Sequence, residues 1–379
     1  MISFILPTRD RPEHLTLTLS ALAMLDAGAL ARVGGAELIV VDNASKHPPV
    51  LPDKLANGIA ARVIFRPTNE GAAARNHAAK TANGDWLIML DDDSAPIDAG
   101  FVDALLAADD SIAAIGAEIL LRDGAHEAGG LPEVIIGCGA AIRRGPYLVA
   151  GGYDPAFGYY AEEYDLCARL LLAGLRVVHD RRFRVVHRKT ADGRDMNLIL
   201  RRLVRNNGWV EQRYAPERIR EDILARTVGR YRLIAEREQA TAGFEEGLRE
   251  LRQTLHDQPR REMSDDVYDR FIGFTAARDR LETELKRTHA TRAITIDDGK
   301  NAWVVKRAIE ECGVQLGRHL RDLGTSGALV VGTLSPGPLT DAALRRAGVA
   351  GPPVISPWWW HAEAAAQPAS VDAAVRAAA

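Results

Sequence analysis

The stretch WLIMLDDD, residues 86–93, joins five apolar residues directly to three aspartates. Upstream of it, SFILP (3–7), ELIVVD (37–42) and ARVIF (61–65) are apolar runs of similar length. Near-continuous apolar runs of this kind are typical of strands buried on both faces of a parallel sheet. Helical patterns separate the runs. The first 190 or so residues therefore predict an α/β fold, in which helices flank a mostly parallel, Rossmann-like sheet.

The rest of this first region continues the alternation. A helix is expected from Gly71 to the Asn83-Gly84 pair, and a strand near 134–142. The segment EEYDLCARLLLAG (162–174) predicts a helix that its glycine ends. LRVVHD (175–180) and FRVVH (183–187) predict two extended runs.

The composition changes after residue 195. Arg, Glu and Leu dominate up to about residue 290, which predicts a helical region over 196–290. AITI and ALVVGTL then alternate with helical patterns, which indicates a small α/β unit over 291–360. We expect the Ala-rich residues 361–379 to form a flexible tail. Trp358, Trp359 and Trp360 are predicted to pack at a domain interface, with contact to an acceptor or a membrane surface as the alternatives.

Composition excludes several classes of protein. The 379 residues carry 48 Lys and Arg against 51 Asp and Glu, so no broad nucleic-acid-binding face is indicated. Cys138, Cys167 and Cys312 are isolated, which predicts a cytoplasmic location rather than a disulfide framework. Cys138 and Cys167 lie in apolar segments and are expected to be buried thiols. We expect neither a leader peptide nor a membrane-spanning helix, while peripheral attachment at the inner face of a membrane stays open.

Polar residues follow the predicted strands at their carboxyl ends, where open α/β sheets bind ligands. PTRDR (7–11) follows the first strand, Asp42-Asn43 the second, and Asp91, Asp92 and Asp93 the fourth. Three adjacent carboxylates repel one another unless a cation or hydrogen-bond donors compensate. Mg²⁺ and Mn²⁺ prefer oxygen ligands and often bind carboxylates together with phosphate oxygens. A diphosphate-bearing substrate is therefore indicated, and a solvated acidic turn is the alternative.

Six motifs in order carry a resemblance to a known family. They are PTRDR, VDNAS (41–45), NEGAAARN (69–76), LDDDSAP (90–96), GGYDPAF (151–157) and EEYDLCARLLLAG. Together they resemble family 2 glycosyltransferases of the GT-A fold. The resemblance covers about residues 1–190 and implies a nucleotide-sugar-binding catalytic domain over 1–195. It also implies a GT-A sheet and a nucleoside-diphosphate sugar as the donor.

The resemblance also implies roles for residues at the donor site. Asp91 and Asp93 would be the outer residues of the DXD motif, and Asp93 would bind Mg²⁺ or Mn²⁺ directly. Asp91 or Asp92 would help to hold the ribose or the waters of the metal, and His187 would lie near the metal or the diphosphate. The remaining donor contacts would come from Pro7, Thr8 and Arg9 at the base and ribose, Asp42 at the base or ribose, and Arg75 near the diphosphate or the acidic cluster.

For the catalytic base, the resemblance points to Glu163, the second residue of an acidic pair that is Glu162-Glu163 here. Glu162 or Asp165 is the alternative base. From the residues alone, all three lie at a helix start, where acidic side chains favourably meet the helix dipole and need no catalytic role. His187 alone would be a structural histidine, and His126 has no companion at metal-ligand spacing.

The implied function is an inverting, metal-assisted transfer of a sugar to an acceptor hydroxyl, in which a carboxylate takes the hydroxyl proton. The acceptor would be a glycan, a lipid-linked sugar or a protein. A sugar nucleotidyltransferase is the first alternative, but SFILPTRDR lacks the Gly-rich loop with which those enzymes begin. The second alternative is a non-catalytic or partner-dependent module that binds nucleotide or glycan in a glycan-assembly complex.

Overall fold

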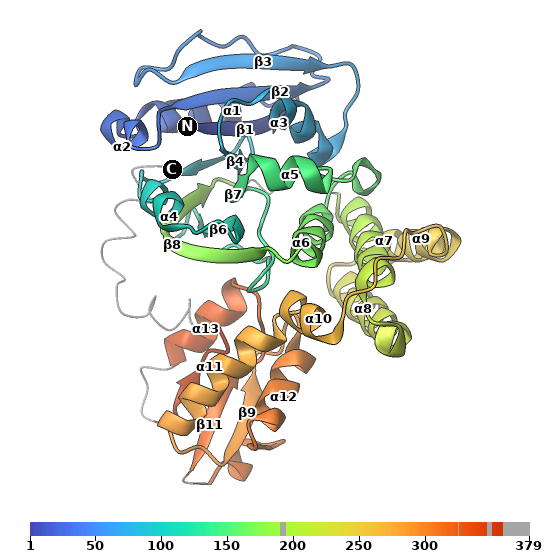
Figure 1. Cartoon of the computed structure of the whole chain (residues 1–379). Coiled ribbons are helices and arrows are strands. Elements are labelled where there is room, and N and C mark those ends of the chain that lie inside the picture. Colours follow the sequence, from blue (N-terminus) through green and yellow to red (C-terminus); the bar gives the residue numbers. More distant parts are fainter. Residues whose placement is uncertain (190–194, 325, 347–350, 359–379) are drawn as a thin grey trace.

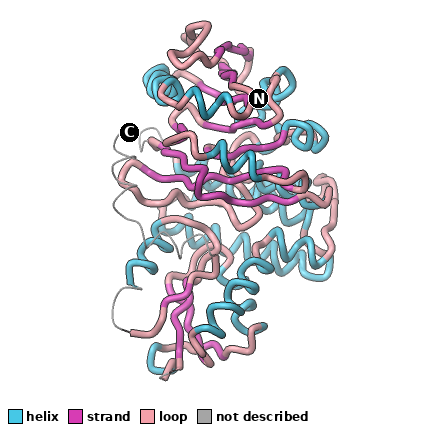
Figure 2. Tube along the Cα trace, turned by 60° about the vertical axis from the view of Figure 1, so that its left-hand side comes forward, coloured by secondary structure: helices cyan, strands magenta, loops and turns pink. Residues whose placement is uncertain are grey.

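The structure, a computed structural model, describes residues 1–189, 195–324, 326–346 and 351–358. Figure 1 shows a large sheet in the upper part of the molecule and a small sheet in the lower part, with a group of helices beside them. The tube in Figure 2 shows the same two sheets from another side.

The large sheet has eight strands in the order β3-β2-β1-β4-β7-β6-β8-β5. The strands β3, β2, β1 and β4 are parallel, and β7 is antiparallel to both of its neighbours, β4 and β6. β6 and β8 are parallel, and β5 closes the edge antiparallel to β8. The strands are β1 (Ile2–Thr8), β2 (Ala36–Asn43), β3 (Ala60–Arg66), β4 (Trp86–Leu90), β5 (Ser94–Pro96), β6 (Ile112–Leu121), β7 (Gly139–Arg143) and β8 (Arg176–His187).

Helices cover both faces of the large sheet. The side chains of β1 are apolar on both faces and pack against these helices. Phe4 and Leu6 pack with α1 (Pro12–Ala23), α2 (Ala27–Ala31) and α4 (Phe101–Ala107) on one face. Ile5 packs on the opposite face with α3 (Arg75–Thr81), α5 (Arg144–Ala150) and α6 (Glu162–Leu172). Successive strand residues point to opposite faces, and each fully buried side chain of this size contributes about 1.5–3 kcal/mol.

Five helices follow the large sheet, and the first of them packs against the α6 helix. The amphipathic α7 and α9 lie against each other and bury one face each. The five helices are α7 (Met196–Tyr214), α8 (Glu217–Arg237), α9 (Thr241–Thr254), α10 (Asp265–Phe271) and α11 (Phe274–Arg287).

The small sheet has four parallel strands in the order β10-β9-β11-β12. Figure 1 shows α11 beside this sheet, and α11 packs against α12. Its elements are β9 (Arg292–Ile296), α12 (Ala302–Glu311), β10 (Gln315–Leu316), β11 (Gly327–Val331), α13 (Pro338–Arg346) and β12 (Val354–Ile355).

The predicted fold class is confirmed, but several local predictions are wrong. The strand expected near 134–142 begins only at Gly139, because Val134 pairs with Leu131 in an isolated β-bridge and not with a strand of the large sheet. The two runs within 175–187 form one strand, β8, whose pairing with β6 is interrupted by register shifts. The sequence-based assignment also omitted β6, although its run IAAIGAEILL is apolar throughout except for one glutamate.

The domain boundaries stay predictions. The α11 helix, which composition groups with the helical region, packs against α12 of the small unit. Trp358 is buried and its ring contacts His179 of β8 edge-on, while Trp359, Trp360 and the 361–379 tail lie outside the described residues. Among the described residues, no helix combines the length and apolar character that crossing a bilayer requires.

Candidate active site

The carboxyl ends of three parallel strands meet at one edge of the large sheet. In the β1–β2 pairing Thr8 lies opposite Asp42, and in the β1–β4 pairing Ile5 lies opposite Met89. The aspartates that follow β4 therefore emerge beside the end of β1. Asp42 is buried, and its Oδ1 accepts a hydrogen bond from the Ser45 N–H at 3.3 Å.

Asp92 and Asp93 are held by donors from the segment after β1. The Thr8 hydroxyl donates to Asp92 at 2.8 Å, and the two Nη atoms of Arg11 donate to Asp92 and Asp93, each at 2.6 Å. Both carboxylates are buried, with 4% and 7% of their side chains exposed. Arg11 lies in the PTRDR motif but was not among the predicted site residues. The feature that could have identified it is its position directly before a predicted helix.

Asp91 is the most accessible of the three aspartates, with 39% of its side chain exposed. Arg75, which is buried, donates through Nη2 to both the Asp91 carboxylate and the Leu90 carbonyl. The end of β4 is thus followed by one solvent-accessible carboxylate, Asp91, and two buried ones, Asp92 and Asp93. A ligand that approaches from solvent meets Asp91 first.

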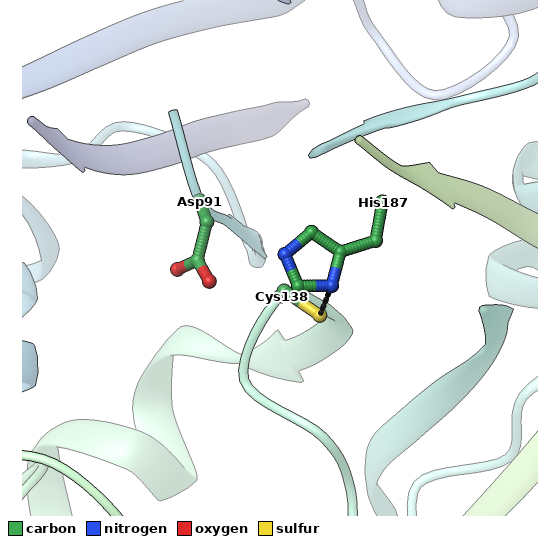
Figure 3. Close-up of side chains that lie close together, drawn as sticks. All are labelled: Asp91, Cys138 and His187. Carbon is green, nitrogen blue, oxygen red and sulfur yellow. Dashed lines mark hydrogen bonds between the residues drawn. The ribbon is translucent and has the colours of Figure 1, made fainter. Parts of the chain in front are cut away.

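His187, the last residue of β8, closes the other side of the acidic cluster. Its Nε2 lies 3.2 Å from Asp93 Oδ1, and its Nδ1 lies 3.1 Å from Glu127 Oε2. Cys138 Sγ lies 3.6 Å from the same Nδ1. Figure 3 shows Asp91, Cys138 and His187 pointing toward one another. One ligand atom of each lies within 4.8 Å of the others, so the three could share a metal ion.

The donor set fits a hard divalent cation. Asp91 offers oxygen and His187 nitrogen, which suit Mn²⁺, while the soft Cys138 thiol would suit Zn²⁺. Burial raises the pKa of the Cys138 thiol, which keeps it protonated and makes it a poor ligand at neutral pH. Burial alone would lower the pKa of His187, but the thiol and two carboxylates around it raise that pKa. His187 therefore holds a proton between these carboxylates, and a metal ion that binds its nitrogen must displace that proton.

The N-terminus of α6 places two glutamates beside this cluster. Burial and the neighbouring Glu163 raise the pKa of Glu162 well above its usual range. Burial also raises the pKa of Glu163, whose Oε1 accepts a hydrogen bond from the Gly137 N–H at 3.0 Å. The charge of Asp91 acts on both glutamates. Burial thus outweighs the helix dipole, which alone would lower both pKa values.

Three buried polar atoms beside these glutamates form no hydrogen bond with any described residue. They are Glu162 Oε2, Arg75 Nε and the Tyr153 hydroxyl. The charges of Arg75 and Glu162 act on each other and on Tyr153, so the three lie close together. An unpaired buried polar atom costs about 1–3 kcal/mol, and such a group is expected where a polar ligand completes the hydrogen bonds.

Asp165 differs from the two glutamates because protein partners use both of its oxygens. Arg213 Nη1 and the Tyr214 hydroxyl donate to Oδ1 at 2.8 and 2.7 Å. Arg169 donates to Oδ2 at 2.6 and 3.0 Å. Asp165 therefore joins α6 to α7, and the geometry favours Glu163 or Glu162 over Asp165 as a base.

The helical region reaches the loop that precedes α6. The Asn206 side chain is fully buried and donates to the carbonyls of Phe157, Tyr159 and Tyr160 at 2.7–3.0 Å. Tyr160 and Ala161 have φ angles of 74° and 67°, which non-glycine residues rarely adopt. The α7 helix thus fixes the backbone that aims the start of α6.

The remaining sequence-based assignments lie at the margin of this cluster. Pro7 is buried within β1. Arg9 is exposed, and its nearest carboxylate is that of Asp10 at 3.9 Å. His126 is structural as expected, although it has two carboxylate partners: it lies 2.7 Å from Asp341 and 3.2 Å from Glu118. Spacing in the sequence gave no signal for this set, because Asp341 lies 215 residues away.

Comparison with known proteins agrees with the resemblance. Residues 3–117 match the family model of Glycosyl transferase family 2. The O-antigen biosynthesis protein RfbC of Myxococcus xanthus is 25% identical over 230 residues, which are 51% of this chain and 18% of that protein. An uncharacterized glycosyltransferase of Haemophilus influenzae is 35% identical over 94 residues, which are 24% of this chain and 29% of that protein. The matches thus span less than a third of these curated relatives.

Solved structures of similar shape include GalNAc-T7 with UDP, GalNAc and Mn²⁺, at a TM-score of 0.48 and 18% identity, with 68% of this chain and 57% of that chain covered. The mannosyltransferase PcManGT of Pyrobaculum calidifontis, solved with GDP-Man and Mn²⁺, has a TM-score of 0.44 and 14% identity. That match covers 82% of this chain and 85% of the other.

Proposed function

We propose, from the premise that residues 3–117 form a family 2 glycosyltransferase domain, that the protein transfers a sugar from a nucleoside-diphosphate sugar to an acceptor hydroxyl with inversion. The observation that carries this proposal is the polar cluster at the sheet edge. There an accessible carboxylate, Asp91, lies near two glutamates of raised pKa, and three buried polar atoms lack protein partners.

Asp91 and His187, with Asp93 beside them, would hold Mg²⁺ or Mn²⁺ at the donor diphosphate. A divalent cation supplies charge neutralisation to the departing nucleoside diphosphate. The sequence-based preference for Asp93 as the direct ligand shifts to Asp91, because 39% of the Asp91 side chain is exposed against 7% of the Asp93 side chain. Asp42, buried at the end of β2, is proposed to bind the base or the ribose.

Glu163 is the proposed base, and Glu162 is its neighbour of higher proton affinity. The acceptor oxygen forms a bond to the anomeric carbon while the bond from that carbon to the diphosphate oxygen breaks. The hydroxyl proton moves to Glu163, and the leaving nucleoside diphosphate takes the electron pair. A base works best when its pKa lies near the working pH, and burial moves the pKa of Glu163 in that direction.

Calorimetric titration with UDP, GDP, CDP and ADP, with and without Mn²⁺, tests the donor site. We expect wild type to bind one of the nucleotides only when Mn²⁺ is present. Asp91→Asn should lose this Mn²⁺-dependent binding. Asp110→Asn is the matched control, because its side chain is fully exposed away from the cluster. If folded wild type binds none of the four nucleotides, the enzyme proposal fails. The non-catalytic module would then be the better explanation.

A further inference from the structure

A cavity of about 320 Å³ lies outside the donor site, between the helical region and the small α/β unit. Its walls come from α6, α7, α8, α10 and the loop that leads into α12. In Figure 1 the first four of these elements are labelled close together, right of the centre. The volume is at the lower end of the range for ligand pockets, which leaves room for a small molecule.

The cavity lining is rich in cations. Lys300 enters from the loop before α12, and Arg226 and Arg230 lie one helical turn apart on α8. None of the three forms an ion pair with another residue in the described parts of the chain. Lys306 and Arg307, only six and seven residues beyond Lys300, do form such pairs, with Asp298 and Asp269. The cavity thus gathers three basic groups without ion-pair partners among the described residues, although the charge of Glu163 acts on Lys300.

The contacts of Lys300 are weak ones for a cation. Its Nζ contacts the Tyr164 hydroxyl and lies 4.0 Å from the centre of the Tyr164 ring. Burial lowers the pKa of Lys300 to about 7, even though the charge of Glu163 opposes the change. A charged lysine in this place therefore lacks a strong partner, and an anion would supply one.

Glu211 is the carboxylate in the lining, and it does not compensate these cations. Its Oε2 accepts a hydrogen bond from the Tyr268 hydroxyl at 2.7 Å. Burial raises the pKa of Glu211 to about 7, and no basic group contributes to that shift. Among the described residues, Glu211 forms no ion pair with Lys300, Arg226 or Arg230. The α12 helix also begins here without a side-chain cap, because the Asn301 side chain donates to the Ile272 carbonyl instead.

We propose that this cavity is a binding site for an anionic group, a phosphate or a carboxylate, with Lys300 as its central cation and Arg226 and Arg230 at its side. Guanidinium and ammonium groups bind such oxygens by charge-assisted hydrogen bonds. Trp303 and Tyr231 also line the cavity, and the guanidinium groups of Arg226 and Arg230 lie over their rings at 5.6 and 5.1 Å. None of these residues belongs to the acidic cluster after β4, although the charge of the proposed base Glu163 acts on Lys300.

Calorimetry on the full chain in metal-free buffer tests this proposal. The probes are inorganic phosphate, glucose 1-phosphate and glucuronate, with glucose as the neutral control. We expect at least one anion to bind and glucose not to bind. Tighter binding of glucose 1-phosphate than of inorganic phosphate assigns the anion to a sugar ligand, and equal binding assigns it to free phosphate.

Lys300→Met should weaken anion binding by about tenfold or more, because it removes the central charge while keeping a chain of similar length. Lys306→Met, on the α12 helix that follows Lys300, is the matched control and should bind as wild type does. If Lys300→Met fails to fold, Arg226→Gln replaces it as the test variant, because Arg226 is exposed. It should also weaken anion binding. If Lys300→Met binds as tightly as wild type, or if folded wild type binds none of the three anions, the proposal is overturned.

Asp91→Asn keeps the two proposals separate. This variant should retain anion binding in the cavity while it loses metal-dependent nucleotide binding. If wild type binds no nucleotide, only the proposal for the donor site fails. If wild type binds no anion, only the proposal for the cavity fails.

Discussion

Glu163 and Asp165 lie two positions apart in α6, but their surroundings differ. Glu163 has one backbone donor, the Gly137 N–H, and lies at the partly open start of the helix. Asp165 is 1% exposed and is surrounded by two arginines and a tyrosine. Residue type does not separate these roles, since both are carboxylates. Their burial and their partners do.

Replacing Glu163 by Gln should therefore remove the proposed base and little else. We expect the rate of sugar transfer to fall by about 10²–10⁴-fold, the usual contribution of a general base. Nucleotide binding should not change. The measurement is release of nucleoside diphosphate from the donor, with the exposed Glu245→Gln as the control. Normal turnover in the Glu163 variant would exclude Glu163 from this role.

At the scale of elements, α6 is held in place from two sides. The α7 helix contacts α6 through Arg213 and Tyr214, and it contacts the loop before α6 through Asn206. That loop also rests on the short helix η1 (Gly71–Ala74). There the Ala72 N–H donates to the Gly158 carbonyl at 2.8 Å. The element that carries the proposed base is thus positioned by segments both before and after it in the chain.

Asp165→Asn tests the contact between α6 and α7. The variant keeps the shape of the side chain but leaves the buried Arg213 and Arg169 with one fewer counter-charge. Breaking a buried pair of this kind costs about 3–5 kcal/mol, reduced here because Arg213 also contacts Asp154. Urea unfolding should show a clear loss of stability, and the exposed Asp279→Asn should show none. Equal stability of the two variants would contradict the proposed clamp.

Gly71→Ala tests the contact between η1 and the loop before α6. Gly71 has a φ of 62°, and a Cβ there would lie 2.3 Å from the Gly158 carbonyl oxygen. The variant must shift the loop, so we expect both a lower melting temperature and weaker transfer activity. Gly145→Ala is the control, since a Cβ there meets no atom within 4 Å. A Gly71 variant as stable and active as that control would show that the close approach is unimportant.

At the scale of the whole molecule, the small α/β unit is attached to the large sheet by a histidine. His126 lies between Glu118 of β6 and Asp341 of α13. The Ser335 hydroxyl adds a second contact, donating to the Gly129 carbonyl and accepting from the Gly129 N–H, each at 2.9 Å. Charge on one imidazole therefore contributes to how the two sheets are joined.

This attachment should weaken at alkaline pH. Burial alone would lower the pKa of His126, but Asp341 and Glu118 raise it from 6.5 to about 9. The stabilisation by His126 is thus complete below about pH 6.5 and is lost as pH rises toward 9, with a maximum of about 3 kcal/mol at 1.36 kcal/mol per unit. Urea unfolding at pH 6 and pH 9.5 measures it. His126→Gln should remove most of this difference; an unchanged pH dependence would argue against the imidazole.

Much of the sheet could be predicted because its strands are buried on both faces. The apolar runs at 3–7, 37–42 and 86–90 are unambiguous for this reason, and the carboxyl-end rule places Asp42 and Asp91 at one edge. The start of the strand β7 was misjudged because residues 134–138 are as apolar as a strand, although their only β pairing within the described chain is the isolated bridge of Val134 with Leu131. Hydropathy reports burial and does not report which neighbour provides it.

The partners of the site were less predictable than its carboxylates. Arg11 lies 81 residues from Asp92, and Cys138 lies 49 residues from His187, so nothing local in the sequence links them. Lys300 was missed for the same reason, since it reaches Tyr164 from 136 residues away. Contacts over such separations depend on how the units pack together, which motif spacing does not encode.

The clamp between Asp165 and α7 has a consequence for communication within the protein. The α7 helix also lines the cavity of Lys300, so one rigid element faces the cavity and holds the helix that carries Glu163. A ligand that moves α7 when it binds in the cavity would also change the position of Glu163. Such coupling is reciprocal, because a donor that orders α6 must alter the affinity of the cavity by the same factor. The two compartments then act as a single thermodynamic unit.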